Sequence, residues 1–187
     1  MRIITGDFKG RKIEMPAGYD IRPTTEKVKE AMFSIIGQDI YGAVCADLFS
    51  GTGNLGLEAL SRGADKCWFS DNNRESIKLI RRNIENCRAE EWSELVPGDF
   101  EKCLLRIKES GDKVDVFLLD PPYKKGLYGR CFELIRELDL LAEDGIIMTE
   151  HKREDEFPEE LEGFVKLKDR NYGTITLSVY CNLYKDS

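Results

Sequence analysis

Apolar residues along the chain follow two spacings, one typical of buried strands and the other typical of amphipathic helices. From residue 44 onward, short apolar runs alternate with segments in which apolar residues recur three and four positions apart. The predicted strands cover residues 44–49, 67–71, 94–97, 114–120 and 145–150, and the predicted helices cover 54–62, 77–87, 101–109 and 128–138. Strands that alternate with helices predict a mostly parallel sheet with helices on both faces.

The two ends of the chain depart from this alternation. Residues 2–5 and 12–15 predict the arms of a short hairpin, and a helix follows that begins at Pro23 and ends at Gly37. At the other end, two predicted strands follow each other with no helix between them, which adds an antiparallel edge to the sheet. These strands cover residues 164–170 and 174–184, after a charged stretch, 152–163, that predicts a solvated loop or a short helix.

Together these elements predict an α/β fold with a doubly wound, mostly parallel seven-stranded sheet, an antiparallel C-terminal hairpin and a Rossmann-like arrangement. The 187 residues are expected to form a single domain. Within it, residues 1–40 form an N-terminal hairpin and helix, and residues 41–187 form the core.

The composition is that of a soluble globular protein, and no apolar run reaches the roughly 20 residues that a membrane helix needs. The N-terminal residues lack the apolar stretch of a secretory signal, so we expect a cytoplasmic protein. The six cysteines include no CxxC pair, which predicts buried free thiols. Because His151 is the one histidine, neither a histidine-based metal centre nor a Ser-His-Asp triad is expected, and no metal is predicted.

The net charge of −7 opposes binding to nucleic acid, but the charge is unevenly distributed. Residues 1–36 carry seven basic and five acidic side chains, a net +2, which leaves −9 for the remainder. Lys27 and Lys29 are expected to be ordinary solvated positions on a helix. The basic side chains that flank loops are instead predicted to contact phosphate; they are Lys9, Arg11, Lys12, Lys124 and Lys125.

A glycine-rich loop, Gly51-Thr52-Gly53-Asn54-Leu55-Gly56, follows the first strand of the core and opens a helix. It matches the dinucleotide pattern GxGxxG, and Asp71 lies twenty residues beyond Gly51, where an acid that binds ribose is expected. This pattern alone suits either NAD or S-adenosylmethionine. Asp47, just before the glycines, favours the second, because a pyrophosphate would be repelled by a carboxylate whereas a sulfonium and an ammonium would be attracted.

Four predicted strands each deliver an acid to the same edge of the sheet, where ligands of such folds bind. These acids are Asp47, Asp71, Asp99 and Asp120. Asp99 would accept a hydrogen bond from an adenine amino group, and Phe100 would cover the ring; the alternative is a turn at Asp99 and a core position for Phe100. The predicted cofactor contacts are Asp47, Ser50, Gly51, Thr52, Gly53, Asp71, Asn72, Asp99 and Phe100.

The sequence Asp120-Pro121-Pro122-Tyr123 follows the apolar run 114–119 and carries the predicted chemistry. An acceptor, two prolines and an aromatic ring at a strand end form a rigid slot for a planar amino group. The Asp120 carboxylate and the Pro121 carbonyl would accept its two N–H groups, and Tyr123 would stack on the base. Asp120 needs no elevated pKa for this role. Arg22, near the slot, would bind phosphate or close over the cofactor, although a plain helix start explains Pro23 equally well.

Over nearly its whole length the chain resembles the bacterial small-subunit ribosomal RNA guanine-N2 methyltransferases, the RsmD-like group of class I enzymes. The matching stretches are Arg2-Ile3-Ile4-Thr5-Gly6, Gly10-Arg11-Lys12, Arg22-Pro23-Thr24-Thr25, Asp47-Leu48-Phe49-Ser50-Gly51-Thr52-Gly53, Leu57-Glu58-Ala59-Leu60-Ser61-Arg62-Gly63 and Asp120-Pro121-Pro122-Tyr123. The resemblance implies S-adenosylmethionine as cofactor and methylation of one guanine N2 in 16S ribosomal RNA, within a small-subunit particle. Nothing in the chain indicates an obligate partner, so we expect a monomer.

Three alternatives share parts of this pattern. An amino methyltransferase acting on adenine N6 or a glutamine amide would have both core motifs. An NAD-dependent oxidoreductase would have the glycine loop but has no use for Asp47 or the double proline. A non-catalytic RNA-binding module would bind through residues 1–36 and would not depend on Asp120.

Overall fold

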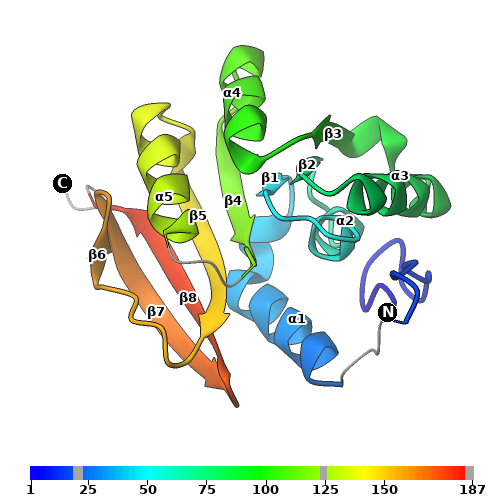
Figure 1. Ribbon diagram of the computed structural model, residues 1–187, viewed down its shortest axis with the longest axis horizontal. Coiled ribbons are helices and arrows are strands. Elements are labelled where there is room, and N and C mark those ends of the chain that lie inside the picture. Colours follow the sequence, from blue (N-terminus) through cyan, green and yellow to red (C-terminus); the bar gives the residue numbers. More distant parts are fainter. Residues whose placement is uncertain (19–22, 123–125, 184–187) are drawn as a thin grey trace.

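Eight strands form one sheet, in the order β3-β2-β1-β4-β5-β8-β7-β6, within residues 1–18, 23–122 and 126–183, which the structure describes (Figure 1). The structure is a computed structural model. The strands are β1 (Val44–Asp47), β2 (Lys66–Asp71), β3 (Ser93–Pro97), β4 (Val114–Leu119), β5 (Leu141–Lys152), β6 (Glu160–Leu161), β7 (Phe164–Tyr172) and β8 (Ile175–Asn182). The helices are α1 (Pro23–Ile36), α2 (Asn54–Ser61), α3 (Arg74–Cys87), α4 (Phe100–Ser110) and α5 (Leu127–Glu137), with short 3-10 helices η1 (Gly37–Ile40) and η2 (Glu90–Trp92).

The direction of the strands confirms the predicted fold. β3, β2, β1, β4 and β5 pair in parallel, while β5, β8, β7 and β6 pair in antiparallel fashion. The sheet differs from the prediction in having an eighth strand, because β6 lies in the stretch 152–163 that was expected to be a loop or a short helix. β6 covers two residues at the edge of the sheet, too few for any hydrophobic period to reveal it.

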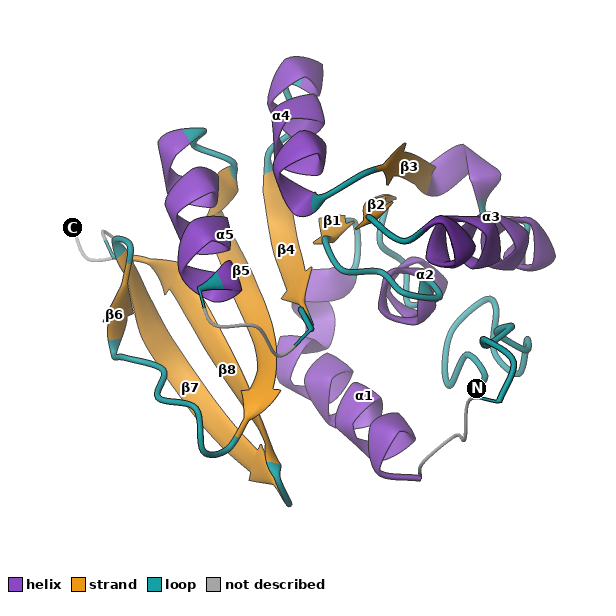
Figure 2. Cartoon of the chain, in the orientation of Figure 1, coloured by secondary structure: helices purple, strands orange, loops and turns teal. Residues whose placement is uncertain are grey.

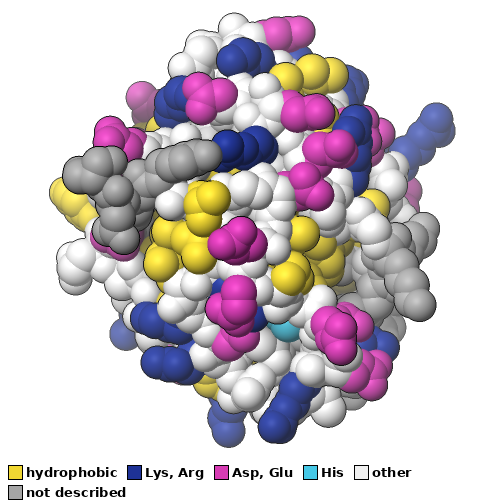
Figure 3. All heavy atoms as spheres, turned by 90° about the vertical axis from the view of Figure 1, so that its left-hand side faces the viewer, with side chains coloured by type: hydrophobic (Ala, Val, Ile, Leu, Met, Phe, Trp, Pro, Cys, Tyr) yellow, Lys and Arg dark blue, Asp and Glu magenta, His cyan; other side chains and the backbone are white. Residues whose placement is uncertain are grey.

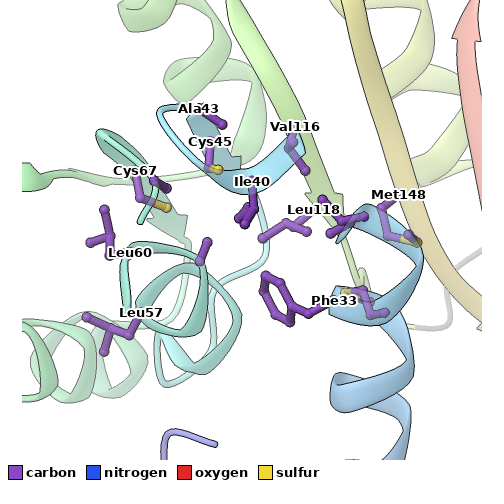
Figure 4. Packing of buried hydrophobic residues seen from close by; sticks show 14 of the residues in the cluster. Phe33, Ile40, Ala43, Cys45, Leu57, Leu60, Cys67, Val116, Leu118 and Met148 are labelled. Atoms are coloured by element: carbon purple, nitrogen blue, oxygen red, sulfur yellow. The ribbon is translucent and has the colours of Figure 1, made fainter. Parts of the chain in front are cut away.

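The helices cover both faces of the sheet (Figure 2). α1, α2 and α3 pack on one face, and α4 and α5 pack on the other, each layer with its own apolar cluster. Figure 4 shows part of the first cluster, in which Phe33 of α1 lies near Leu118 of β4, and Leu57 lies beside Leu60 on α2. Side chains alternate between the two faces, so Phe117 belongs to the second cluster. No described helix is long and apolar enough to cross a membrane.

The six cysteines are all buried and free, which confirms their predicted state. They are distributed over strands and helices on both faces of the sheet, at positions 45, 67, 87, 103, 131 and 181. Burial raises the pKa of the Cys103 thiol to about 12, so this group stays protonated at neutral pH. The cysteines therefore fill the core.

The N-terminal segment forms a shorter hairpin than predicted. Its backbone pairs at Arg2 and Lys12, and the amide of Ile3 donates to the Arg11 carbonyl at 3.0 Å. Beyond this point the amides of Ile4 and Thr5 turn to the carboxylate of Glu58 on α2, at 2.9 and 3.1 Å. The hairpin ends early because a buried acid on the neighbouring helix accepts the hydrogen bonds that a partner strand would have taken.

The prediction that Lys29 is a solvated surface residue was wrong. Its side chain is buried, and its ammonium lies 3.0 Å from Glu58 Oε2 while donating at 2.8 Å to the Arg2 carbonyl and to Asn54 Oδ1. Lys27 is exposed, as expected. Helical spacing alone could not predict which of the two lysines is buried, because Glu58, the acid that permits burial of the Lys29 charge, lies on another helix.

Candidate active site

Four acids stand at the carboxyl ends of neighbouring strands. Asp47 ends β1, Asp71 ends β2, Asp120 follows β4 and Glu150 lies near the end of β5. Leu119 of β4 and Thr149 of β5 are register partners, so the two acids that follow them are neighbours. The group therefore consists of three predicted acids, Asp47, Asp71 and Asp120, together with Glu150, which was not predicted. The fourth predicted acid, Asp99, lies farther along the sheet edge, after the end of β3.

Burial and mutual repulsion raise the pKa of three of these carboxyl groups, those of Asp47, Asp120 and Glu150. Burial raises the pKa of Asp47 to about 7, and the charges of Asp120 and Asp71 add to the effect. Burial also raises the pKa of Asp120, to about 6, although the predicted role does not require it. Burial, followed by the charge of Asp120, raises the pKa of Glu150. A cation placed among these groups would favour their ionised forms.

The glycine loop lies directly against two of the acids. The amide of Gly51 donates to Asp71 Oδ2 at 2.9 Å, and the amide of Gly56 donates to Asp47 Oδ2 at 3.1 Å. Asp47 is therefore a buried acceptor for the first turn of α2, and it would act on a ligand through its charge. Gly53 has φ of +80°, a conformation that favours glycine just before a helix.

Ser50 and Thr52 hold the loop through hydrogen bonds within the protein. Ser50 Oγ donates to the Asp47 carbonyl at 2.7 Å and accepts from the amide of Ser70 at 3.1 Å. The Thr52 carbonyl accepts from Asn83 Nδ2 of α3 at 2.8 Å. Ser50 is buried and Thr52 is half-buried, so the loop is fixed before any ligand binds.

Beside the glycine loop, the ends of β2 and β3 and the first turns of α3 line a hollow of about 330 Å³. Asp71, Asn72, Pro97 and Gly98 form its strand side. Asp71 uses one oxygen on Gly51 and the other, at 2.8 Å, on the amide of Asn73. Since each carboxylate oxygen accepts two hydrogen bonds, both retain capacity toward a ligand.

The two residues predicted to hold an adenine ring differ in accessibility. Asp99 is exposed and caps α4, with Oδ1 accepting from the amide of Lys102 at 2.9 Å, so its other oxygen is available. Phe100 is buried in the second apolar cluster. Its ring centre lies 5.5 Å from that of Phe49, which is half-buried and follows β1.

The predicted slot for the reacting amino group is described in part. Asp120 is half-buried, Pro121 is buried and Pro122 is exposed. Tyr123, Lys124 and Lys125 lie outside the described residues, as does Arg22. Next along the chain, the hydroxyl of Tyr128 donates to the carbonyl of Glu150, which ties α5 to the end of β5.

The basic residues of the N-terminal segment fall into two groups. Lys9 and Lys12 are exposed. Arg11 is half-buried: it donates to the carbonyl of Asn86 on α3 at 3.1 Å, and its guanidinium lies 5.4 Å from the centre of the Phe8 ring. Arg11 therefore also holds the segment against the core.

Sequence reasoning missed two polar residues that shape the site. Glu150 could have been found by the rule that identified the other acids, because it stands near the end of a predicted strand. Asn83 gave no such indication, since it lies within an amphipathic helix. Its amide accepts from the amide of Glu14 at 2.8 Å and donates to the Glu14 carbonyl at 3.1 Å and to the Thr52 carbonyl, so it joins the N-terminal segment to the glycine loop.

The parallel sheet with its antiparallel closing hairpin, and the acids along its carboxyl edge, define a class I methyltransferase with a Rossmann-like fold. The family model described as "Conserved hypothetical protein 95" matches residues 1–181, and the chain belongs to that family. This confirms the predicted RsmD-like membership.

Known proteins resemble this chain over most of its length and most of theirs. The chain is 37% identical to the putative rRNA methyltransferase YlbH of Bacillus subtilis, over 96% of this chain and 98% of that protein. It is 30% identical to ribosomal RNA small subunit methyltransferase D of Escherichia coli, over 84% and 78% of the two chains. The solved structure of the putative methyltransferase yhhF from Escherichia coli superposes with a TM-score of 0.83, at 28% identity and 96% coverage of both chains.

Proposed function

We propose that this protein transfers a methyl group from S-adenosylmethionine to the exocyclic N2 amino group of a guanine in small-subunit (16S) ribosomal RNA. The names of the relatives support an RNA substrate in the small ribosomal subunit. The observation that carries the chemistry is the position of Asp120, which follows β4 among the carboxylates of the sheet edge and precedes two prolines. We further propose that the protein acts in the cytoplasm as a single-domain monomer.

The carboxyl edge suits S-adenosylmethionine better than a dinucleotide. When bound, this cofactor supplies a methyl group on a positively charged sulfur. Asp47, Asp71, Asp120 and Glu150 form a concentration of acid that would repel a pyrophosphate and attract a sulfonium. Asp71 is placed to bind the ribose hydroxyls. Asn72, which lines the hollow, and Asp99 would flank the adenine, and the backbone of Gly51, which donates to Asp71, would lie beneath the cofactor.

The target amino group would be held by two acceptors. The Asp120 carboxylate and the Pro121 carbonyl accept its N–H groups, which turns the nitrogen lone pair toward the methyl group and keeps the base from rotating. Because the methylated ammonium is a very strong acid, the Asp120 carboxylate can take its proton, and the raised pKa of Asp120 makes this carboxylate a stronger base. Tyr123 would stack on the base, a contact worth ~1–3 kcal/mol.

Basic loops around the crevice would hold the RNA backbone. Lys9 and Lys12 are exposed on the N-terminal segment. Arg11 would contribute its charge as well, although it also donates to the Asn86 carbonyl. We propose that Lys124, Lys125 and Arg22 also contact the RNA phosphates. Such contacts to phosphate position the RNA without reading its sequence.

The variant Asp120→Ala tests the proposal. It should abolish methyl transfer to small ribosomal subunits taken from source cells in which the gene is deleted, while calorimetry still shows binding of S-adenosylmethionine, because Asp47, Asp71 and Glu150 remain. Asp65→Ala is a matched control, because Asp65 is an exposed acid at the opposite, amino end of β2. Full activity of Asp120→Ala would refute the assignment.

A further inference from the structure

Helix α3 carries a concentration of positive charge that the proposed catalytic site does not use. Residues 74–88 contain five basic and two acidic side chains, a net +3 in a chain whose total is −7. The helix buries one face, through Leu79, Ile80, Ile84 and Cys87, and exposes Arg74, Lys78, Arg81 and Arg82 on the other.

The first three of these cations line the hollow at the ends of β2 and β3. Arg74, Lys78 and Arg81 stand at helical spacing of four and three residues, which places them on one ridge. They form the wall opposite Asp71, Asn72, Pro97 and Gly98, around the same volume of about 330 Å³. This ridge therefore borders the crevice in which the cofactor is proposed to bind.

Internal ion pairs leave most of this charge unneutralised. Lys78 pairs with Glu75 at 2.8 Å, but both side chains are highly exposed, so the pair is weak. Arg82 lies 3.1 Å from Glu14 of the N-terminal segment. Among the residues that the structure describes, Arg74 and Arg81 take part in no ion pair. Two guanidinium groups at the mouth of the hollow thus face solvent.

The proposed cofactor does not account for these cations. S-adenosylmethionine carries an ammonium, a sulfonium and one carboxylate, and its adenosine part has no phosphate. A positive ridge beside its binding site would oppose a ligand of net positive charge. Arginine forks are suited instead to planar anions such as phosphate, which they bind through paired hydrogen bonds.

The basic N-terminal segment packs against the carboxyl half of the same helix. Arg11 donates to the carbonyl of Asn86 near the end of α3, and Phe8 lies beside Trp92, with ring centres 6.5 Å apart. In the sheet, β2 and β3 are two and three strands from β4, or roughly 10–15 Å from the Asp120 slot. A chain of phosphates a few nucleotides long spans such a distance.

We propose that Arg74, Lys78 and Arg81 form a second contact with the phosphate backbone of the RNA substrate, on the side of the cofactor crevice away from the Asp120 slot. This inference rests on the proposed function. In this proposal, one stretch of the RNA runs across the mouth of the crevice, from the slot at Asp120 to α3. The ridge contributes affinity and orientation and makes no contact with the reacting atoms.

A charge-reversed pair tests it against a matched control. Arg74→Glu/Arg81→Glu is compared with Lys168→Glu/Arg170→Glu, which changes the net charge equally on exposed residues of β7, near the opposite edge of the sheet. Figure 3 shows the face at that end of the molecule, where basic and acidic side chains are interspersed. Affinity for small ribosomal subunits from the deletion strain is measured over a range of salt, and affinity for S-adenosylmethionine by calorimetry.

The Arg74→Glu/Arg81→Glu variant should bind the particle at least about tenfold more weakly than wild type at about 0.1 M salt. The slope of its plot of log affinity against log salt should be smaller in magnitude by about 1 to 2. Its affinity for S-adenosylmethionine should be unchanged or slightly higher, and the β7 pair should behave as wild type in both assays. Equal losses in the two pairs, or a loss of cofactor affinity alone, would overturn this inference and leave the proposed function standing. A wild-type protein that neither binds nor methylates the particle would remove both.

Discussion

The ammonium of Lys29 on α1 lies 3.0 Å from a carboxylate oxygen of Glu58 on α2, and both side chains are buried. Glu58 also accepts from the amides of Ile4 and Thr5, and Lys29 donates to Asn54, the first residue of α2. One buried pair therefore joins the N-terminal segment, α1 and α2 immediately behind the candidate site. We expect it to set the position of the N-terminal segment relative to the core.

Removing the charge of Lys29 should be strongly destabilising. Lys29→Met leaves Glu58 buried with Arg62 as its remaining cation, at 2.9 Å, and breaking a buried pair from one side costs about 3 kcal/mol or more. Lys27→Met on the exposed side of the same helix should change stability by less than about 0.5 kcal/mol. Urea unfolding of both variants measures the difference, and equal stability of the two would contradict a structural role for the pair.

Gly56 is required by the close approach of α2 to β2. A methyl group at this position would lie 2.3 Å from a ring carbon of Phe69 and 2.8 Å from the Cys67 sulfur. Gly56→Ala should therefore lower the free energy of unfolding by about 1–3 kcal/mol, because overpacking forces shifts in the strand. Gly129→Ala in α5 is the control: nothing lies within 4 Å of its added carbon, so it should stabilise by roughly 0.5–1 kcal/mol through helix propensity. Thermal unfolding distinguishes these opposite signs.

The affinity for S-adenosylmethionine should increase as the pH rises from about 5.5 to about 8. Burial raises the pKa of Asp47 to about 7 and that of Asp120 to about 6, so both groups are mainly protonated at the lower pH and mainly charged at the higher. The charged forms attract the sulfonium, and we expect the affinity to rise roughly tenfold.

S-adenosylhomocysteine is the matched control for this titration, because it shares the adenosine, ammonium and carboxylate of the cofactor but lacks the positive charge on sulfur. Its affinity should depend less on pH. Calorimetry across the same range measures both ligands. Identical pH dependences for the two would show that the carboxylates do not act on the sulfonium.

Much of the fold could be predicted from the sequence because its signals are local. The alternation of strand and helix spacing from residue 44 onward predicted the parallel order of the core, and the absence of a helix before β8 predicted the antiparallel edge. Glycines at the ends of predicted helices helped to place their boundaries. β6 was not predicted, because two residues at the edge of a sheet are too few to show the alternation of apolar and polar positions that marks a strand.

The candidate site was predictable to the extent that strand ends determine it. The rule that acids at the carboxyl ends of parallel strands meet in one crevice brought Asp47, Asp71 and Asp120 together correctly. Burial of Asp47 and Phe100, and the partners of Lys29, depend on which helix packs against which strand. That information comes from contacts between residues far apart in the chain, and a single sequence gives no access to it.

The most direct measurement of the central claim is nucleoside analysis of small ribosomal subunits treated with this protein and S-adenosylmethionine labelled in its methyl group. With particles from the deletion strain, the account predicts one labelled product, N2-methylguanosine, from wild-type protein and none from Asp120→Ala. Label in N6-methyladenosine, in 5-methylcytidine or in a protein glutamine, with none in guanosine, would contradict it.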